Sequence, residues 1–336
     1  MFNIKKVYLT LFAVSLILLT ACSNTSSTEE NSEDKKLTIM TSIYPLYDFT
    51  SKIVGDRAEV INLVPAGAEP HDFEPTAKDM TNLSKANIFI YNGGGYETWI
   101  EDVLNSIDQQ DMSILNVSEN LDLLTVEETG GEDNHDHDGH EEESKHEEEV
   151  NHVEEEELAG EYDPHVWLDP LRAKQIAEMI KDELIKVDED GKDVYEKNFN
   201  ELASEFDALH SEYETALNNP SQKEVIVSHA AFGYLANRYG LDQISISGLT
   251  PSDEPSPKEL LEIINFAEEN EVKYIMFETL VSPKVAETVQ DKIGAKALTL
   301  NPLEGLTKKE IEEGKDYFSV MRENLESLKM ATGSES

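Results

Sequence analysis

The chain has 336 residues and a formal net charge of −43, from 70 Asp and Glu against 27 Lys and Arg. This acidic excess argues against a nucleic-acid partner, because phosphate backbones are bound by clustered Lys and Arg, and it favours cations as ligands. The single cysteine can form neither an intrachain disulfide nor a thiolate zinc site, so a metal site must be built from His and carboxylates. The length predicts two lobes.

The first residues are typical of an export signal. Two lysines precede an apolar run over residues 7–19, and the sequence then reads LTAC at 19–22. This stretch resembles a bacterial lipobox, which implies a signal peptide over 1–21 and a lipid on the sulfur of Cys22. Two acyl chains suffice for stable anchoring in the lipid bilayer. The alternative to a lipobox is an ordinary signal peptide in which the cysteine is incidental. Residues 22–36 then predict a flexible tether, with the protein anchored on the extracellular face of the cell membrane.

From Leu37 onward, short apolar runs alternate with helical patterns. We expect strands at 37–43, 59–64, 86–91, 113–117, 223–228, 243–247, 273–277 and 296–300. We expect helices between them at 45–54, 96–107, 230–239, 257–269, 283–292 and 307–329. This alternation predicts an α/β fold with mostly parallel sheets. Because four strands fall on each side of a helical middle, the fold should comprise two βα lobes.

The helical middle predicts a rigid connector between the lobes. Asp169 and Pro170 begin a helix that runs to about Val187, as N-cap and first helical residue. Apolar residues then recur at steps of three and four through a second helix, about 40 Å long at 1.5 Å per residue. Large hinge opening would have to bend this helix. The expected domains are an N-terminal lobe at 37–189, a linking helix at 190–219 and a C-terminal lobe at 220–331.

An acidic insertion interrupts the N-terminal lobe at residues 127–161. It contains 17 acidic residues and one lysine, and its five histidines are His135, His137, His140, His146 and His152. A segment of this composition cannot bury apolar surface, so we expect a mobile surface loop. The histidines and carboxylates either capture a metal ion weakly for a nearby site, or form a solvated loop whose metal contacts are incidental.

Three histidines outside the insertion lie beside expected strand ends or helix starts. They are His71, His165 and His229. Taken singly, each is more typical of a hydrogen-bonded structural residue. Together they favour a metal site, because ligands of open α/β sheets bind at the carboxyl edge of the strands.

Other conspicuous residues favour structural roles. His210 lies within the long helix and is expected to pack or to face solvent. The run Gly93 to Gly95 lacks the pattern of a nucleotide-binding loop and indicates a turn. Trp99 and Trp167 are expected to be packing residues.

Four segments resemble successive blocks of one family, the zinc and manganese solute-binding lipoproteins of ABC transporters. They are residues 67–75 (GAEPHDFEP), 163–170 (DPHVWLDP), 228–234 (SHAAFGY) and 301–304 (NPLE). The resemblance covers residues 37–328, and the acidic His-rich insertion belongs to the zinc branch. It implies two βα lobes joined by one long helix, with the metal in the cleft between them.

The resemblance also implies a ligand set. His71 and His165 would come from the N-terminal lobe, His229 from the C-terminal lobe, and Glu304 would be the fourth ligand. Some zinc members leave the fourth position to water, which is the alternative to Glu304. Glu278 is a competing carboxylate, but a hydrogen-bonded role at its strand end is the better expectation.

The residue at position 229 favours zinc over manganese. Manganese members carry a glutamate there, whereas three imidazoles and one carboxylate suit a near-tetrahedral Zn²⁺ site. Because the imidazoles must be neutral, affinity should fall as the pH drops through about 6.5. Asp72, Asp163 and Asp169 are near enough in sequence to orient the rings, although helix capping is the stronger role for Asp169.

The sequence therefore predicts a binding protein rather than an enzyme. We expect a monomeric receptor that captures extracellular Zn²⁺ and delivers it to the permease of an ABC transporter. The alternatives are a manganese receptor of the same family, a secreted zinc hydrolase, and a surface adhesin or metal buffer. A hydrolase is disfavoured because the sequence lacks HExxH and a motif-placed general base.

Overall fold

The structure is a computed structural model that describes residues 36–130 and 160–334, and the chain from Leu37 onward forms one compact unit. The expected signal peptide, the proposed anchor Cys22 and the five histidines of the insertion lie outside the described residues. Among the described helices, none is both long and apolar enough to cross a membrane.

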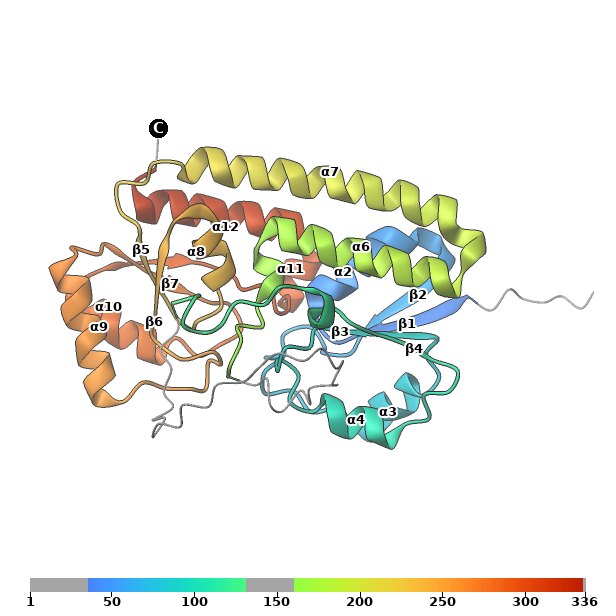
Figure 1. Ribbon diagram of the computed structural model, residues 1–336. Coiled ribbons are helices and arrows are strands. Elements are labelled where there is room, and N and C mark those ends of the chain that lie inside the picture. The colour runs from blue at the N-terminus through green and yellow to red at the C-terminus, as the bar shows by residue number, and fades with distance from the viewer. Residues whose placement is uncertain (1–35, 131–159, 335–336) are drawn as a thin grey trace, which may run out of the picture. The chain divides into compact units, whose positions relative to one another are not determined.

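Two four-stranded sheets, all parallel, underlie the fold (Figure 1). The first has the order β2-β1-β3-β4 and consists of β1 (Leu37–Thr41), β2 (Ala58–Asn62), β3 (Ile88–Tyr91) and β4 (Ser113–Asn116). The second has the equivalent order β6-β5-β7-β8 and consists of β5 (Glu224–Val227), β6 (Asp242–Ser245), β7 (Tyr274–Phe277) and β8 (Lys296–Thr299). The expected two-lobed α/β fold is confirmed.

Helices cover both faces of the first sheet because its strands are apolar on both sides. Along β1, Ile39 belongs to the core under α2 (Tyr44–Val54), α6 (Pro170–Val187) and α7 (Lys192–Leu217). The next residue, Met40, points to the opposite face and packs with residues of α3 (Ala77–Leu83) and α4 (Ile100–Ser106). This alternation is the period-2 pattern of a strand.

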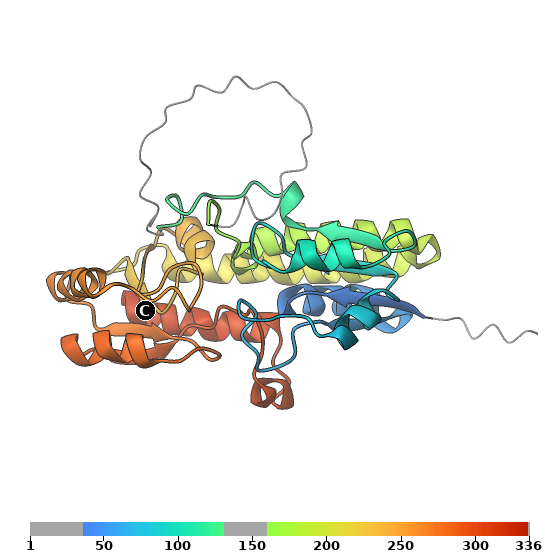
Figure 2. The same ribbon diagram turned by 90° about the horizontal axis from the view of Figure 1, so that it is seen from below.

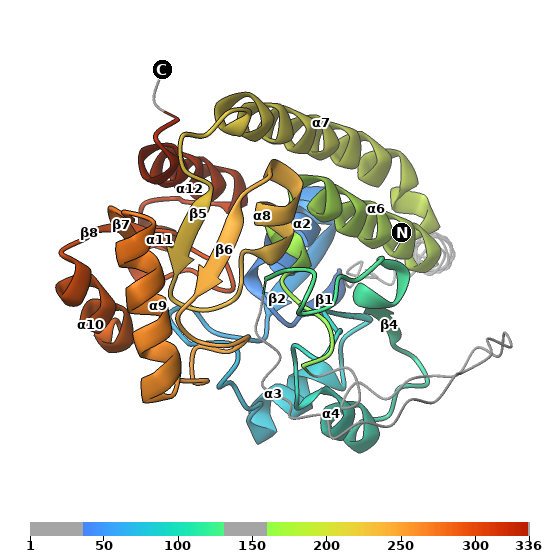
Figure 3. The same ribbon diagram turned by 60° about the vertical axis from the view of Figure 1, so that its left-hand side comes forward.

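The second sheet is covered in the same way. On one face lie α8 (Gly233–Tyr239) and α12 (Tyr317–Thr332), and on the other α9 (Pro257–Glu269) and α10 (Lys284–Ile293), as Figure 3 shows. The short helix α11 (Lys308–Glu312) precedes α12. Single turns of 3₁₀ helix lie at η1 (Gly55–Arg57), η2 (Ser118–Asn120), η3 (Val166–Leu168) and η4 (Glu189–Gly191).

The long helix α7 joins the lobes through a shared core. Seen from below in Figure 2, it runs past helices of both lobes. Its Phe206 ring lies 5.2 Å from the Phe49 ring of α2 and 4.9 Å from the Phe318 ring of α12, measured between centroids. One apolar cluster therefore extends from the first sheet to the second, and opening the lobes would expose buried aromatic rings to water.

Two helical predictions need correction. The expected continuous helix over 307–329 is broken between α11 and α12, because Gly314 adopts a left-handed φ of 72°. Asp316 then begins α12 by accepting a hydrogen bond from the backbone N–H of Ser319. The sequence reading also missed α3, a seven-residue helix that Thr76 begins with a capping box.

The junction of α6 and α7 provides a stability test. Asp188 accepts hydrogen bonds from Tyr195 (2.6 Å) and Arg57 (2.7 Å). Partial burial acts to raise the pKa of Asp188, but the hydrogen bonds from Tyr195 and Arg57 outweigh it and hold the pKa below 3.8. Because the folded-state pKa is lowered, the stabilisation is present above pH 3.8 and is lost as the pH falls through the folded-state pKa.

We therefore expect Asp188→Asn to lower the free energy of unfolding by roughly 1–2 kcal/mol at pH 7. Denaturant titrations at pH 7 and in acid should show that the difference from wild type shrinks in acid. The exposed Asp190→Asn is the matched control and should stay within about 0.5 kcal/mol of wild type. A deficit of the same size at both pH values would contradict this account.

Candidate metal centre

Four side chains from both lobes converge at the carboxyl edges of the two sheets. His71 lies in the loop after β2, and His165 lies just before η3. His229 follows β5, and Glu304 follows β8. One nitrogen from each histidine and one carboxylate oxygen all lie within 4.8 Å of one another. The structure thus brings together the four residues that the sequence analysis proposed as ligands.

The distances from the carboxylate oxygen to the three nitrogens fit a small tetrahedral cation. Oε1 of Glu304 lies 3.0 Å from Nε2 of His71 and 3.3 Å from Nε2 of both His165 and His229. Four ligands at metal–ligand distances of about 2.0–2.1 Å around a tetrahedral centre would be separated by roughly 3.3 Å. The donor set of three imidazoles and one carboxylate suits zinc better than manganese, which prefers oxygen ligands.

Carboxylates behind two of the histidines orient their rings. Asp163 accepts from both the backbone N–H and Nδ1 of His165, each at 2.9 Å. Glu278 accepts from the backbone N–H of His229 at 3.1 Å and from its Nδ1 at 2.8 Å. With the proton on Nδ1, each Nε2 has a lone pair directed at the centre. Glu278 is therefore a hydrogen-bonded residue at a strand end, as expected.

The four side chains are almost completely removed from solvent. Glu304 is 1% exposed, and only His71 retains measurable side-chain exposure, at 6%. Nε2 of His165, Nε2 of His229 and Oε2 of Glu304 are buried without a hydrogen-bond partner among the described residues. Such atoms are costly unless something else binds them, and a cation would satisfy the nitrogens directly.

The electrostatics of the cluster centre on Glu304. Burial alone would raise the pKa of Glu304, but the charges of His71 and His229 hold it well below its ordinary value. Burial lowers the pKa of His71, despite the opposing charge of Glu304. The carboxylate is thus a fixed negative charge in a dry site.

A network of hydrogen bonds holds the segment that carries Glu304. Asn301 donates its backbone N–H to the side chain of Asn324, which returns a bond to the Asn301 carbonyl. Leu303 adopts a left-handed φ of 59° and donates its N–H to the Asn301 side chain. The indole of Trp167 donates to the carbonyl of Pro302 at 2.8 Å, which ties η3 to the same segment. These bonds offset the strain at Leu303.

Two residues missed by the sequence reading border the cluster. Tyr96, after the three glycines, packs its ring 4.5 Å from that of His71. Burial and the charges of Glu304 and Glu69 raise the pKa of Tyr96 well above 10.0, so the hydroxyl keeps its proton. Glu69 accepts the backbone N–H of His71, and burial together with the charge of Glu304 raises its pKa to about 8. Only the closeness of Glu69 to His71 in sequence could have suggested that Glu69 borders the cluster.

The remaining residues singled out from the sequence have structural positions. Asp169 caps α6 by accepting from the backbone N–H of Leu171, as expected. Asp72 is exposed, and it contacts no histidine ring among the described residues. His210 bonds to the hydroxyl of Tyr239, away from the cluster.

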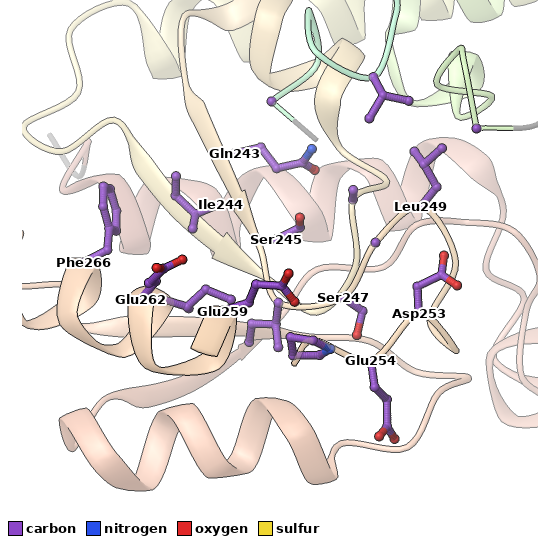
Figure 4. Close-up of a pocket in the computed structure, with 18 residues that line it drawn as sticks. Gln243, Ile244, Ser245, Ser247, Leu249, Asp253, Glu254, Glu259, Glu262 and Phe266 are labelled. Carbon is purple, nitrogen blue, oxygen red and sulfur yellow. The ribbon is translucent and has the colours of Figure 1, made fainter. Parts of the chain in front are cut away.

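Two cavities lie near the cluster. His71, Phe73 and Trp99 help to line one of about 710 Å³, so His71 stands between this cavity and Glu304. The other, of about 570 Å³, lies between β6 and α9 (Figure 4) and reaches Ala230, next to His229. Four of its eighteen lining residues are acidic, and none is Lys, Arg or His.

Sequence comparisons identify similar proteins over nearly the full length. The profile of the family described as "ZnuA: Zinc-uptake complex component A periplasmic" matches residues 39–331. The high-affinity zinc uptake system protein ZnuA of Bacillus subtilis is 42% identical over 94% of both chains. The zinc-binding lipoprotein AdcA of Streptococcus pneumoniae is 38% identical over 98% of this chain, which spans 62% of that longer protein.

Solved structures show the same fold. The Zn(II)-bound ZnuA-like domain of Streptococcus pneumoniae AdcA superposes with a TM-score of 0.71 at 36% identity, covering 88% of this chain and 99% of that one. The laminin-binding protein of Streptococcus agalactiae, described as a bifunctional adhesin and metal transporter, gives a TM-score of 0.71 at 32% identity over the same shares of the two chains.

The carboxylates behind the histidines can be tested separately from the cluster. We expect Asp163→Asn to weaken binding of Zn²⁺ about 10- to 100-fold, because a neutral acceptor holds the Nδ1 proton of His165 less firmly. Competition with a chromophoric chelator would measure this change. Glu183→Gln, which alters a buried carboxylate bonded to Ser113, is the control and should bind zinc like wild type. Equal affinities for Asp163→Asn and wild type would refute the positioning role.

Proposed function

This chain belongs to the family of zinc-uptake complex component A, and from that premise we propose that it is the zinc-binding receptor of an ABC transporter. It captures extracellular Zn²⁺ and delivers the ion to the membrane permease. Zinc is the transported cargo, not a resident cofactor. The family consists of uptake components, which counts against the alternative of a secreted zinc hydrolase.

The observation that carries this proposal is the meeting of Glu304 with three imidazole nitrogens at 3.0–3.3 Å in a buried site. We assign His71, His165, His229 and Glu304 as the four zinc ligands. The alternative fourth ligand Glu278 is engaged with Nδ1 of His229, which supports Glu304 in that role. The same nitrogen-rich donor set, and the zinc-binding relatives, disfavour the manganese alternative.

We further propose the domain organisation read from the sequence, with lobes at 37–189 and 220–331 joined by a linking helix at 190–219. One parallel sheet is formed by strands that precede α7 in the sequence and the other by strands that follow it, which supports this division. Lipid attachment at Cys22 and residence on the extracellular face of the membrane are supported by the LTAC sequence and by lipoproteins among the relatives. We propose that the receptor acts as a monomer.

The ligand assignment predicts one tight Zn²⁺ per chain. Isothermal titration, with a competing chelator for the tightest variants, should show at least a 100-fold loss of affinity in His165→Ala. This loss is expected because the remaining ligands leave one tetrahedral position and a buried cavity unfilled. His210→Ala removes a histidine bonded to Tyr239 and should bind zinc like wild type. Unchanged zinc binding in His165→Ala would contradict the assigned site.

The insertion can be tested by deletion of residues 131–159. We propose that His135, His137, His140, His146 and His152 capture zinc weakly and raise its local concentration near the cluster. Zinc uptake by cells should then slow at limiting zinc and recover when zinc is abundant, while the tight site is retained. Unchanged uptake at limiting zinc would show that the insertion has no capture role. Normal zinc-limited growth without the whole protein would instead favour an adhesin or a passive metal buffer.

A further inference from the structure

A buried hydroxyl beside the proposed ligands lacks a hydrogen-bond partner. Tyr96 is 3% exposed, and its hydroxyl oxygen has no partner within the described part of the chain. A buried polar atom left unsatisfied costs about 1–3 kcal/mol, so folded proteins rarely keep one without a reason. Phe would fill the same space without that cost.

The turn that carries Tyr96 is built to hold it in place. Gly93, Gly94 and Gly95 have φ values of 72°, 65° and 80°, a run of left-handed residues that glycine tolerates. A Cβ atom on Gly93 would approach Oδ1 of Asn116 to 2.0 Å, so a side chain is excluded there. Glu97 accepts the backbone N–H groups of Asn92 and Gly93, each at 2.9 Å. The three glycines and the hydrogen bonds to Glu97 therefore define the backbone of the turn that leads into Tyr96.

The ring of Tyr96 forms one wall of the metal centre. Its centroid lies 4.5 Å from that of His71, 5.9 Å from that of His165 and 5.3 Å from that of Trp167. Both of these histidines contact Oε1 of Glu304, His71 at 3.0 Å and His165 at 3.3 Å. A donor without an acceptor thus lies beside the histidines that surround Glu304.

Glu304 also has a buried oxygen without a hydrogen-bond partner among the described residues. Its Oε1 atom contacts Nε2 of all three histidines, whereas its Oε2 atom is buried and has no hydrogen-bond partner in the described chain. A carboxylate can bind a metal through one oxygen or through both. The state of Oε2 therefore decides whether the ion is four-coordinate or five-coordinate.

We propose that Tyr96 is a positioning residue that donates a hydrogen bond to Oε2 of Glu304 when the metal is bound through Oε1. The bond occupies Oε2 and keeps Glu304 monodentate, so the ion remains four-coordinate. Zinc favours this geometry, whereas manganese favours more oxygen ligands, so Tyr96 contributes to the choice of metal. This inference rests on the proposed zinc-binding function and adds a specificity determinant to it.

Cobalt(II) provides a spectroscopic test because its visible bands are strong in four-coordinate sites and weak in five- or six-coordinate sites. Wild type loaded with Co²⁺ should show the strong bands. In Tyr96→Phe we expect weaker bands, a 10- to 100-fold loss of Zn²⁺ affinity, and a smaller preference for Zn²⁺ over Mn²⁺ in competition. Tyr213→Phe removes another buried hydroxyl, bonded to the carbonyl of Met321, and should lose stability without changing the spectrum.

An unchanged cobalt spectrum in Tyr96→Phe would overturn the proposal, even if the affinity fell. The hydroxyl would then contribute to packing or bond to Glu69 rather than to Glu304. If Tyr96→Phe does not fold, X-ray absorption of zinc-loaded wild type decides: one bound carboxylate oxygen supports the proposal, and two contradict it. Failure of the zinc-binding function itself would look different, since wild type would then bind neither Zn²⁺ nor Co²⁺ tightly.

Discussion

A carboxylate buried among three imidazoles is the interaction on which the rest of this structure depends. Removing the charge of Glu304 from water costs several kcal/mol unless a cation or hydrogen bonds compensate it. The surrounding chain supplies the imidazole nitrogens of three histidines rather than permanently charged side chains. A metal ion can take the place of a proton at each of these nitrogens. Asp163 and Glu278 add negative charge behind two of the rings, which favours a dication further.

The fold holds these groups in position before a metal arrives. His229 and Glu304 follow strands of one sheet, and His71 follows a strand of the other, so both lobes must be fixed for the ligand distances to hold. The apolar core beneath α7 fixes them, because Phe206 packs against helices of both lobes. Tyr317 and Trp167 add a hydrogen bond across the same boundary, at 2.6 Å. A site fixed in this way selects ions by size and coordination number.

Much of the fold could be predicted because it follows from local periodicity. The eight expected strands are all present within a few residues, and α6 and α9 have the expected bounds, since Pro170 and Pro257 mark their starts. The prediction of one continuous helix over 307–329 was wrong because Gly314 adopts a left-handed conformation and interrupts it. The short helix α3 offers too few turns for a periodic signal to emerge.

The site was predictable only in part. Histidines and a carboxylate in recognisable blocks suggested the four proposed ligands, and the closeness of Asp163 to His165 in sequence suggested one carboxylate that orients a ring. The other residues that hold the ligands in place depend on three-dimensional packing. Asn324 lies 20 residues from Glu304 in sequence, and nothing in the sequence pattern links the two. Tyr96 follows glycines that indicate only a turn, and its closeness to His71 arises from the crossing of two loops. Such contacts follow from the tertiary fold and carry no local signature.

The most direct test of the account is a crystal structure of the zinc-loaded protein with anomalous diffraction measured on both sides of the zinc absorption edge. The account predicts one strong zinc peak at about 2.0–2.2 Å from Nε2 of His71, His165 and His229 and from Oε1 of Glu304. A principal zinc peak elsewhere in the protein, or one at this position that Glu304 does not contact, would contradict it.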